Sequence, residues 1–437
     1  MTRSVEKVAI IGAGPGGLAA ARVLLANSDF DIVLYERNPN VGGVWYYPHN
    51  APHKDTAMYD QLETNLCKEI MQFSGFPFPE PVPTFPSRSQ VEDYLQAYFK
   101  TFIEPSSRVE VKLGCSVERL EKINGSWHIY AKHSLQAVDY VVVANGHFDV
   151  PYIPWHLPGL EQWISQDPMS ILHSKGFESS KFCRGKTVLV VGNGSSGSDI
   201  TNQVSTTANH VFHSVTDVSK TDWEANPAVT AVATISELDY SHERSVRLQD
   251  GSILTHIDYI IWATGYMYDL PFLRSYRPLV LGTNCNSKPA QRLYNVWEQL
   301  IFTEDPTLAF SLLCKNVVPF PLAELQAAVM AKVFKGEVEV SPSSGQAALA
   351  DESASDTANT SKDYHSLITP RDIEYYRELQ ALLDAHSGAD DSFQPVRWDE
   401  RMAALRYRTG AMKQERTKLL VKNAKELRKQ NLPYRLP

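Results

Sequence analysis

The chain has 437 residues, of which 43% are hydrophobic, and a formal net charge of −8. This length allows two or three domains with substantial cores, and the negative charge argues against a general nucleic-acid binder. The five cysteines are odd in number and widely spaced, with no C-x-x-C pair, which indicates a reducing compartment and argues against a disulfide framework, a metal site and a redox dithiol.

The first predicted element is a strand, a turn and a helix in KVAIIGAGPGGLAAA (residues 7–21), with Gly12, Gly14 and Gly17 in a G-x-G-x-x-G pattern. In a βαβ unit the first glycine makes the tight turn, the second lets a pyrophosphate approach the backbone, and the third lets the helix pack on the strand. Glu36 ends the next predicted strand, DIVLYE, 19 residues after Gly17. A carboxylate there binds ribose hydroxyls, so the pattern predicts a dinucleotide site.

The segment FPSRSQVEDYLQAYFK (residues 85–100) predicts an amphipathic helix, because its apolar residues recur at helical spacing. Ser89 and Glu92 offer a capping box for its start. The apolar residues expected in the core are Val91, Tyr94, Leu95, Tyr98 and Phe99.

A second strand, glycine turn and helix follows in KTVLVVGNGSSGSDI (residues 186–200), with glycines at 192, 194 and 197. We expect the hydroxyls of Ser195 and Ser196 to bind phosphate. The two halves of the chain also echo each other in VDYVVVANG (138–146) and IDYIIWATG (257–265), and each of these strands follows a predicted hairpin with an Asn-Gly or Asp-Gly turn. The order strand, glycine turn, helix, hairpin and closing strand is therefore predicted twice.

The second predicted nucleotide site lacks an acidic residue at the end of its next strand, HVFHS, which ends at Ser214. Without that carboxylate the site would tolerate a 2′-phosphate, which favours NADP over NAD. No arginine stands nearby to bind the phosphate; the candidates are His213, Thr216 and Lys220, and Asp217 could even serve NAD. The preference between NADPH and NADH stays open. Two dinucleotides of different type suggest a flavin that is reduced by a nicotinamide.

The C-terminal part begins with a predicted flexible linker (336–362), which is rich in Ser, Ala and Asp and has no aromatic residue. Helical patterns resume in a basic C-terminal segment (363–437). From Arg401 onward the chain has 11 Lys and Arg against 2 Asp and Glu, and we expect this tail to dock on the protein's own acidic body. Because no apolar run reaches 18 residues, we expect a cytoplasmic protein.

Further motifs carry a resemblance to a known family. They are VGGVWYY after Glu36-Arg37, YDQLETNLCKEIMQFSGFPFP (59–79), FPSR, NGHFDVPYIPWHLPG, ATGY (263–266) and PTLAF…NVVPFPLAELQA (306–327). Their order resembles the flavin-containing monooxygenases of class B, in particular the soluble fungal type, over about residues 5–335. One sequence fingerprint of the family is only partly present in this chain. His173 and Phe177 match it, whereas Asp167 and Met169 stand where the family has Phe and Gly.

The resemblance implies a doubly wound α/β fold with two Rossmann-like domains and a helical C-terminal extension. An FAD-binding domain, split into residues 1–164 and 266–335, would carry an inserted NADPH-binding domain at residues 165–265. NADPH would reduce FAD, and O2 would add to give a C4a-hydroperoxyflavin that oxygenates a nitrogen or sulfur atom of a small molecule. A homodimer is compatible with the family.

The resemblance also implies site residues. Asn65 matches the family's active-site asparagine, whose neutral amide can donate a hydrogen bond without being a proton source, and it could also cap a helix predicted to begin between Leu66 and Met71. A helix starting near Pro321 would point its positive end at the flavin. Glu324 and Gln326 are assigned no role, because solvent-facing helix positions explain them as well. The residues expected to bind a cofactor are Gly12, Gly14, Pro15, Gly16, Gly17, Glu36, Arg37, Gly43, Val44, Trp45, Asn65, Gly192, Gly194, Ser195, Ser196, Gly197, Ser214, Ala263, Thr264, Gly265, Tyr266 and Pro321.

Three alternatives remain open. A Baeyer–Villiger oxygenase would insert oxygen beside a ketone, but such enzymes usually carry Trp where this chain has Phe177. A disulfide reductase would need a dithiol beside the flavin, and the missing C-x-x-C pair argues against it. A non-oxygenating NAD(P)H oxidase or redox-sensing flavoprotein is compatible with the altered fingerprint. His147 and His173 are expected to be packed histidines.

Overall fold

The computed structural model describes residues 5–48, 56–132, 134–221, 223, 226–282, 288–340, 363–388 and 391–437. The chain divides into two compact units. Unit 1 comprises residues 1–46, 66–150 and 267–409, and unit 2 comprises residues 47–65, 151–266 and 410–437. Most of the predicted linker, residues 341–362, lies outside the described residues.

The central sheet of unit 1 has seven strands in the order β18-β19-β20-β7-β1-β2-β3. The five strands from β20 to β3 run parallel, and their central members are almost wholly buried, as expected for a parallel sheet covered on both faces. The strands of this sheet are β1 (Lys7–Ile11), β2 (Asp31–Tyr35), β3 (Val109–Lys112), β7 (Tyr140–Val143), β18 (Val296–Trp297), β19 (Ile301–Phe302) and β20 (Leu308–Phe310).

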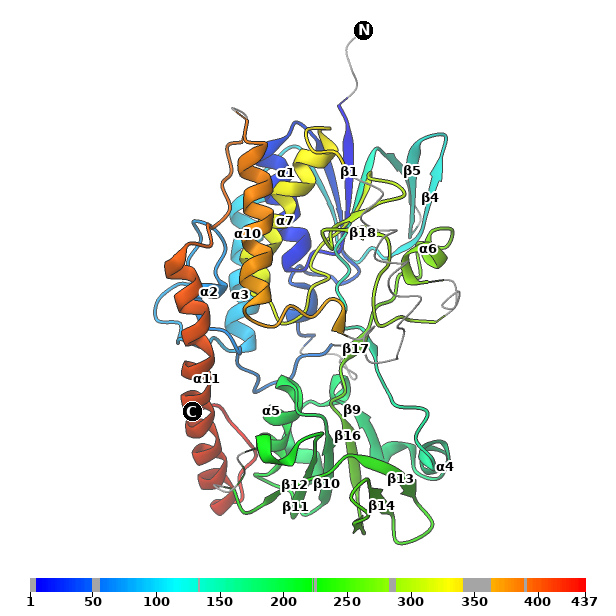
Figure 1. Cartoon of the computed structure of the whole chain (residues 1–437), viewed down its shortest axis with the longest axis vertical. Coiled ribbons are helices and arrows are strands. Elements are labelled where there is room, and N and C mark those ends of the chain that lie inside the picture. The colour runs from blue at the N-terminus through cyan, green and yellow to red at the C-terminus, as the bar shows by residue number, and fades with distance from the viewer. Residues whose placement is uncertain are drawn as a thin grey trace. The chain divides into compact units, whose positions relative to one another are not determined.

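Helices α1, α3, α7 and α10 stand together on one side of this sheet (Figure 1). Helix α7 packs against both α1 and α10, and its residues from Phe320 to Phe334 are all buried. The helices of unit 1 are α1 (Pro15–Asn27), α2 (Lys68–Met71), α3 (Arg88–Phe102), α6 (Arg277–Leu281), α7 (Pro319–Phe334), α10 (Arg371–Ala385) and the first part of α11 (Glu400–Lys429), with a 3-10 turn η1 (Gly43–Trp45).

Helix α3 confirms the predicted amphipathic helix, since all five apolar residues expected in the core are buried. The predicted capping box is wrong by two residues. The N-cap is Ser87, whose side chain accepts a hydrogen bond from the Gln90 backbone N–H, and the Gln90 side chain accepts one from the Ser87 N–H. Glu92 instead pairs with Arg88 at 2.6 Å, because both side chains lie one turn apart on the same face.

A second sheet of unit 1 confirms the first predicted hairpin. It is antiparallel in the order β4-β5-β6, with Asn124 and Gly125 in the turn between β4 and β5. The buried face of β5 packs into the same core as β1 and β7. The bounds are β4 (Val117–Ile123), β5 (Ser126–Ala131) and β6 (Ser134–Val138).

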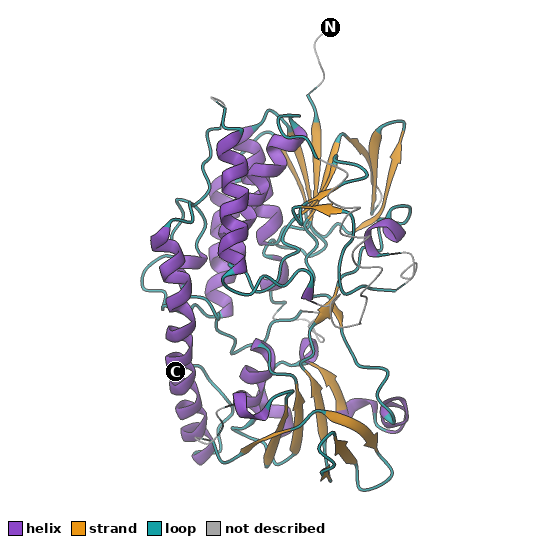
Figure 2. Cartoon of the chain, in the orientation of Figure 1, coloured by secondary structure: helices purple, strands orange, loops and turns teal. Residues whose placement is uncertain are grey.

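Unit 2 repeats this plan on a smaller scale (Figure 2). Its main sheet is parallel in the order β12-β11-β10-β16-β9, and the second predicted hairpin appears in the antiparallel sheet β13-β14-β15. The strands are β9 (Ile171–His173), β10 (Thr187–Val191), β11 (His210–Ser214), β12 (Val229–Val232), β13 (Ile235–Asp239), β14 (Ser245–Leu248), β15 (Ile253–Leu254) and β16 (Tyr259–Trp262).

The remaining elements are short. Strands β8 (Val150–Pro151) and β17 (Tyr266–Met267) form a two-stranded sheet. The helices and 3-10 turns are α4 (Leu160–Gln166), α5 (Ser195–Val204), η2 (Pro168–Ser170), η3 (Ser174–Gly176), η4 (Ser180–Cys183) and η5 (Val218–Lys220). Within the described residues, no helix combines the length and the apolar character needed to cross a membrane.

The compact units differ from the predicted domain boundaries in three places. Unit 2 begins near residue 151 rather than 165, because Leu160 and Trp163 of α4 are fully buried in its core beside β13. It also contains residues 47–65 and 410–437, which the sequence analysis had placed in the first FAD segment and in a separate C-terminal segment. The assignment of FAD and NADPH to these units stays a prediction.

Candidate functional site

We call the glycine turns at residues 12–17 and 192–197 the first and the second cradle. The backbone itself requires glycine at two positions of the first cradle. Gly12 follows β1 with a φ of 105°, and its N–H donates to the Tyr35 carbonyl at 2.7 Å. A Cβ on Gly12 would lie 2.4 Å from the Ala144 carbonyl oxygen, and one on Gly17 would lie 1.8 Å from the Gly12 carbonyl oxygen. Side chains cannot be accommodated at these distances, so both positions need glycine.

A short loop closes over the second glycine of this cradle. The Gly42 N–H donates to the Ala13 carbonyl at 2.9 Å. The turn η1 then brings Gly43 so near that a Cβ on it would lie 2.6 Å from the Gly14 Cα. Gly14 is buried, whereas the η1 residues Val44 and Trp45 stay partly exposed. The structure thus brings VGGVW against the first glycine motif.

Glu36 lies directly behind the cradle, at the end of β2. Its side chain is buried, and its two carboxylate oxygens accept backbone hydrogen bonds from Ala13 at 2.7 Å and Asn38 at 2.8 Å. A carboxylate fixed in this way presents negative charge at the edge of the glycine turn. Arg37, by contrast, lies on the surface and forms a bidentate ion pair with Asp149.

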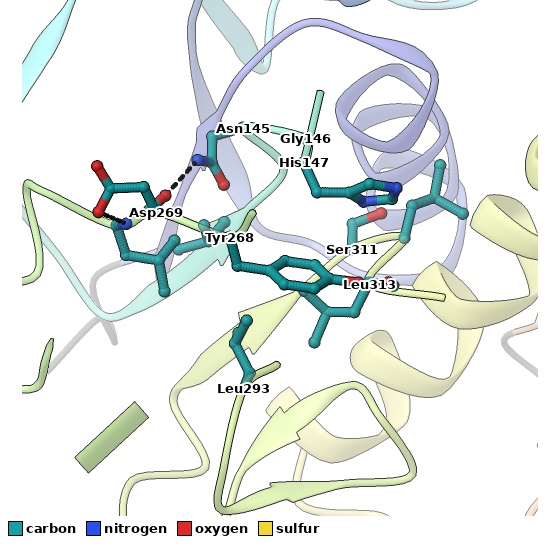
Figure 3. Close-up of a pocket in the computed structure, with 11 residues that line it drawn as sticks. Asn145, Gly146, His147, Tyr268, Asp269, Leu293, Ser311 and Leu313 are labelled. Carbon is teal, nitrogen blue, oxygen red and sulfur yellow. Dashed lines mark hydrogen bonds between the residues drawn. The ribbon is translucent and has the colours of Figure 1, made fainter. Parts of the chain in front are cut away.

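A small pocket lies at the carboxyl ends of β7 and β20, within unit 1 (Figure 3). It gathers the His147 imidazole, the Ser311 hydroxyl and the ring of Tyr268. A Cβ on Gly16 of the first cradle would lie 2.5 Å from the Ser311 Oγ, so the pocket adjoins the cradle. Burial lowers the pKa of His147 to about 3, helped by the nearby Lys315 charge.

Two buried polar atoms of this pocket point to a polar ligand. Within the described residues, neither His147 Nδ1 nor Ser311 Oγ has a hydrogen-bond partner. A buried polar atom without a partner is costly, and such atoms in native structures call for an explanation. The glycine cradle, the Glu36 carboxylate and these two atoms together fit a bound flavin dinucleotide.

The loop from Ser311 to Val318, which leads into α7, is held from several sides. The Leu312 N–H donates to the buried Gln326 side chain at 3.0 Å, and the hydroxyl of Tyr376 donates to the Val318 carbonyl. Pro321 lies in the first turn of α7, which begins at Pro319, close to the predicted start.

The expectation of solvent-facing positions for Glu324 and Gln326 is wrong: both are fully buried. Glu324 accepts hydrogen bonds from the Ser74 N–H at 2.7 Å and the Tyr98 hydroxyl at 2.8 Å, and it pairs with Arg22 at 3.0 Å. Because α1, α2 and α10 pack around α7, even its polar residues lie in the interior. Burial raises the pKa of Glu324 to about 7.

The second cradle repeats the geometry of the first. Gly192 follows β10 with a φ of 112°, and its N–H donates to the Ser214 carbonyl at 2.9 Å. A Cβ would lie 2.5 Å from the Ala263 carbonyl oxygen at Gly192, and 1.8 Å from the Gly192 carbonyl oxygen at Gly197. Helix α5 begins directly after Gly194, so its first N–H groups face the turn.

Gly194 itself is required by neither backbone nor packing. The φ of Gly194 is −75°, close to the −78° of the matching Gly14, and any residue can adopt this extended conformation. A Cβ on Gly194 would meet no atom within 4 Å. Gly194 and Ser195 are exposed and Ser196 is partly exposed. A small residue beside free helix N–H groups leaves room for a phosphate, which fits a dinucleotide.

Ser214 does not face the second cradle with its side chain. Its hydroxyl donates to the Ala233 carbonyl at 3.0 Å and is buried, and the expected contact of Ser214 with the coenzyme stays a prediction. The residue before it, His213, holds the cradle: its Nε2 bonds to the Gly192 carbonyl at 3.0 Å and its Nδ1 accepts from the Trp223 indole at 2.9 Å. Burial lowers the pKa of His213, so the ring is neutral.

The turn ATGY at residues 263–266 lies beside the second cradle. Ala263 is buried under Gly192, and Thr264, Gly265 and Tyr266 are partly exposed. His173 bonds through Nε2 to the Gly265 carbonyl at 3.0 Å and accepts the Lys175 N–H through Nδ1, and burial lowers its pKa to about 4. His173 is thus a packed, neutral histidine, as expected.

Asn65 lies at the end of the segment Tyr59–Asn65 of unit 2, with an exposed side chain. It does not cap a helix: α2 begins at Lys68 and its N-cap is Cys67. Two residues earlier, Glu63 is buried and bonded to Lys413 and Arg416 of α11. No sequence signal indicated Glu63, because its partners lie 350 and 353 residues away in the chain. Ser311 gave no signal either, since only the fold brings it beside Gly16.

Comparisons with known proteins identify the family of this chain. The family model described as "Flavin-binding monooxygenase-like" matches residues 5–226 and 221–389. The thiol-specific monooxygenase of Saccharomyces cerevisiae is 42% identical over 440 residues, covering 99% of this chain and 98% of that protein. The flavin-containing monooxygenase FMO GS-OX1 of Arabidopsis thaliana is 31% identical over 365 residues, covering 76% of this chain and 74% of that protein.

A solved structure shows the same fold. The S-allyl-L-cysteine S-oxygenase from Allium sativum aligns with a TM-score of 0.75 at 24% identity, covering 98% of this chain and 99% of that one. This likeness confirms the expected α/β fold with Rossmann-like units and a helical C-terminal region. Taken with the matches in sequence, it means that the chain belongs to the flavin-containing monooxygenases.

Proposed function

We propose that this chain is an FAD- and NADPH-dependent monooxygenase that oxygenates the sulfur of a small thiol. The balanced reaction is RSH + O2 + NADPH + H⁺ → RSOH + NADP⁺ + H2O, in which sulfur and the nicotinamide each supply two electrons to O2. The resulting sulfenic acid condenses with a second thiol to a disulfide. The observation that carries this proposal is the 42% identity with a thiol-specific monooxygenase along nearly the whole chain.

The first cradle is proposed to hold FAD. The backbone from Gly12 to Gly17 would receive the pyrophosphate at the start of α1, and Glu36 would bind the ribose hydroxyls from its fixed position. When bound, the flavin accepts a hydride and activates O2. Gly43, Val44 and Trp45 would cover the cofactor from the facing loop.

The second cradle is proposed to hold the nicotinamide coenzyme. Its phosphates would lie against Gly194, Ser195 and Ser196, where the chain leaves space and helix N–H groups. The Ser214 hydroxyl is bonded to the Ala233 carbonyl, so a 2′-phosphate would be bound by residues of the following turn. In that turn Lys220 forms an ion pair with Asp217 at 3.3 Å. We propose NADPH as the coenzyme, with NADH as the alternative.

Asn65 is proposed as the catalytic residue by its match to the family motif. Its carboxamide donates a hydrogen bond but releases no proton at neutral pH. Such a donor stabilises developing negative charge on oxygen without hastening the loss of hydrogen peroxide. Separately, within unit 1, the start of α7 at Pro319–Pro321 would offer the flavin the partial positive charge of a helix N-terminus.

The experiment measures NADPH and O2 consumed, hydrogen peroxide released and oxidised thiol formed by the purified flavoprotein. We expect the amount of oxidised thiol formed to nearly equal the amount of NADPH consumed. For Asn65→Ala we expect hydrogen peroxide to replace thiol product, with at least a tenfold loss of coupled turnover, because a lost charge-stabilising donor costs about 3 kcal/mol. Asn65→Asp introduces a carboxylate of the same size and is expected to be equally uncoupled.

The same assay separates the alternatives. Amine oxygenation without thiol oxygenation would move the proposal from sulfur to nitrogen. Ester formed from a simple ketone would establish the Baeyer–Villiger reaction. Hydrogen peroxide as the sole product with thiols, amines and ketones alike would establish a non-oxygenating NAD(P)H oxidase and overturn the proposal. Parallel assays with NADH decide the coenzyme.

A further inference from the structure

The segment that ends at Asn65 is tied down residue by residue within unit 2. The Tyr59 hydroxyl donates to Asp199 of α5 at 2.5 Å, and the Tyr59 ring packs edge-on against Phe177 in the core. The Gln203 side chain of α5 donates to the Gln61 carbonyl at 3.0 Å. The start of this segment is therefore bonded to helix α5, which begins within the second cradle.

The end of the segment is fixed by the C-terminal helix α11. The Glu63 side chain, only 3% exposed, receives the ammonium of Lys413 at 2.9 Å and the guanidinium of Arg416 at 2.8 and 3.0 Å. Lys413 also donates to the Thr64 carbonyl at 2.8 Å. We call Glu63, Lys413 and Arg416 the Glu63 clasp.

The chemistry of the clasp goes beyond a surface ion pair. A carboxylate that is nearly excluded from water and shared by two cations has little freedom to reorient, and charge-assisted bonds of this kind are short and directional. The bond from Lys413 to Thr64 holds the peptide group that joins Thr64 to Asn65. The clasp thus fixes the backbone from which the Asn65 side chain projects.

We propose that the Glu63 clasp is a positioning device for the active site, in which α11 sets the place of the Asn65 carboxamide. Lys413 is the positioning residue, since it alone of the two cations also reaches the Thr64 carbonyl. This inference rests on the proposed function, because it assumes that Asn65 serves the oxygenation. It also gives the basic C-terminal segment a role in catalysis.

The decisive variant is Lys413→Met. It removes the bonds to Glu63 and Thr64 together, while Arg416 still neutralises the buried carboxylate, so we expect the fold to be retained. The matched control is Lys429→Met, which removes the same charge from the same helix, where Lys429 is exposed and pairs with Glu426. Hydrogen–deuterium exchange and product coupling are measured on both full-length holoproteins.

For Lys413→Met we expect exchange of the peptide covering residues 59–66 to rise at least tenfold, with strands β10 and β16 unchanged. We expect the ratio of oxidised thiol formed to NADPH consumed to fall at least threefold, with the remaining NADPH accounted for by hydrogen peroxide. The flavin content and the Kd for NADPH should stay within a factor of two of the parent values. Lys429→Met should match the parent protein in every measurement.

The proposal is overturned if Lys413→Met keeps the exchange and coupling of the Lys429→Met control. It is equally overturned if exchange rises throughout unit 2 and flavin is lost, since the clasp would then only support folding. If the parent protein itself forms no thiol product, the proposed function fails first. That failure is recognised in the parent protein, before any variant is compared.

Discussion

The two glycine cradles share a backbone and differ in their surroundings. In both, the first glycine has a φ near 110° (105° and 112°) and a Cβ on the third would lie 1.8 Å from the carbonyl oxygen of the first. In the first cradle, Gly14 is covered by Gly43 and backed by the Glu36 carboxylate. In the second, Gly194 is open, and a neutral imidazole, His213, backs the turn.

This difference matches the two ways in which an enzyme uses a dinucleotide. A resident cofactor benefits from a cradle that the chain closes around it, whereas a coenzyme consumed in each turnover must enter and leave. If the two cradles hold FAD and NADPH as proposed, the local motif would form the phosphate-binding turn in both places, and the surrounding loops would set how readily each ligand leaves.

The largest effects are expected at the third glycines. In Gly17→Ala and Gly197→Ala the new Cβ would overlap a carbonyl oxygen, which we expect to cost about 3 kcal/mol or more of stability. Gly17→Ala should purify without flavin, whereas Gly197→Ala should keep flavin and lose reduction by NADPH. Absorbance at the flavin maximum and anaerobic reduction rates measure these outcomes, and flavin retained in Gly17→Ala would break the assignment.

The second glycines separate packing from ligand binding. Gly194→Ala adds a methyl group into open space, so we expect an unchanged Tm and at least a tenfold higher Kd for NADPH, about 1.4 kcal/mol. Gly14→Ala places its Cβ 3.3 Å from the Gly43 Cα and should lower stability as well as flavin affinity. An unchanged Kd in Gly194→Ala would mean that coenzyme does not approach this turn.

Acid should weaken the second cradle through His213. Its pKa is lowered by burial, so the folded state binds a proton less readily than the unfolded state. Stability is therefore complete above the ordinary pKa near 6.5 and falls as the pH drops below it, by at most about 1.4 kcal/mol per pH unit for one imidazole. Hydrogen exchange of residues 186–200 between pH 7.5 and 5.5 measures this, and in His213→Gln the pH slope should shrink, by at most one proton.

The smallest effect is expected at Ser214. Because its buried hydroxyl bonds to the carbonyl of the partly buried Ala233, Ser214→Ala should cost about 1 kcal/mol of stability. The ratio of kcat/KM for NADPH to that for NADH should stay unchanged. A shift of this ratio by threefold or more would show that Ser214 contacts the coenzyme after all and would restore the sequence-based expectation.

Patterns within short stretches of the chain determined the elements of both cradles. The glycine spacing, the apolar runs of β1 and β10 and the hairpin turns at Asn124 and Asp250 depend on local conformation and on alternating or continuous burial, which neighbouring residues decide. For this reason the order strand, turn, helix, hairpin and closing strand could be predicted twice, and the structure confirms it.

Only the tertiary structure decided which polar side chains became interior. Glu324 and Gln326 looked like solvent-facing helix positions, but three helices surround α7 and bury both. Glu63 gave no signal because its partners, Lys413 and Arg416, are 350 and 353 residues away in the chain. Burial and long-range ion pairing depend on which elements meet in space, and a sequence pattern describes only the residues beside it.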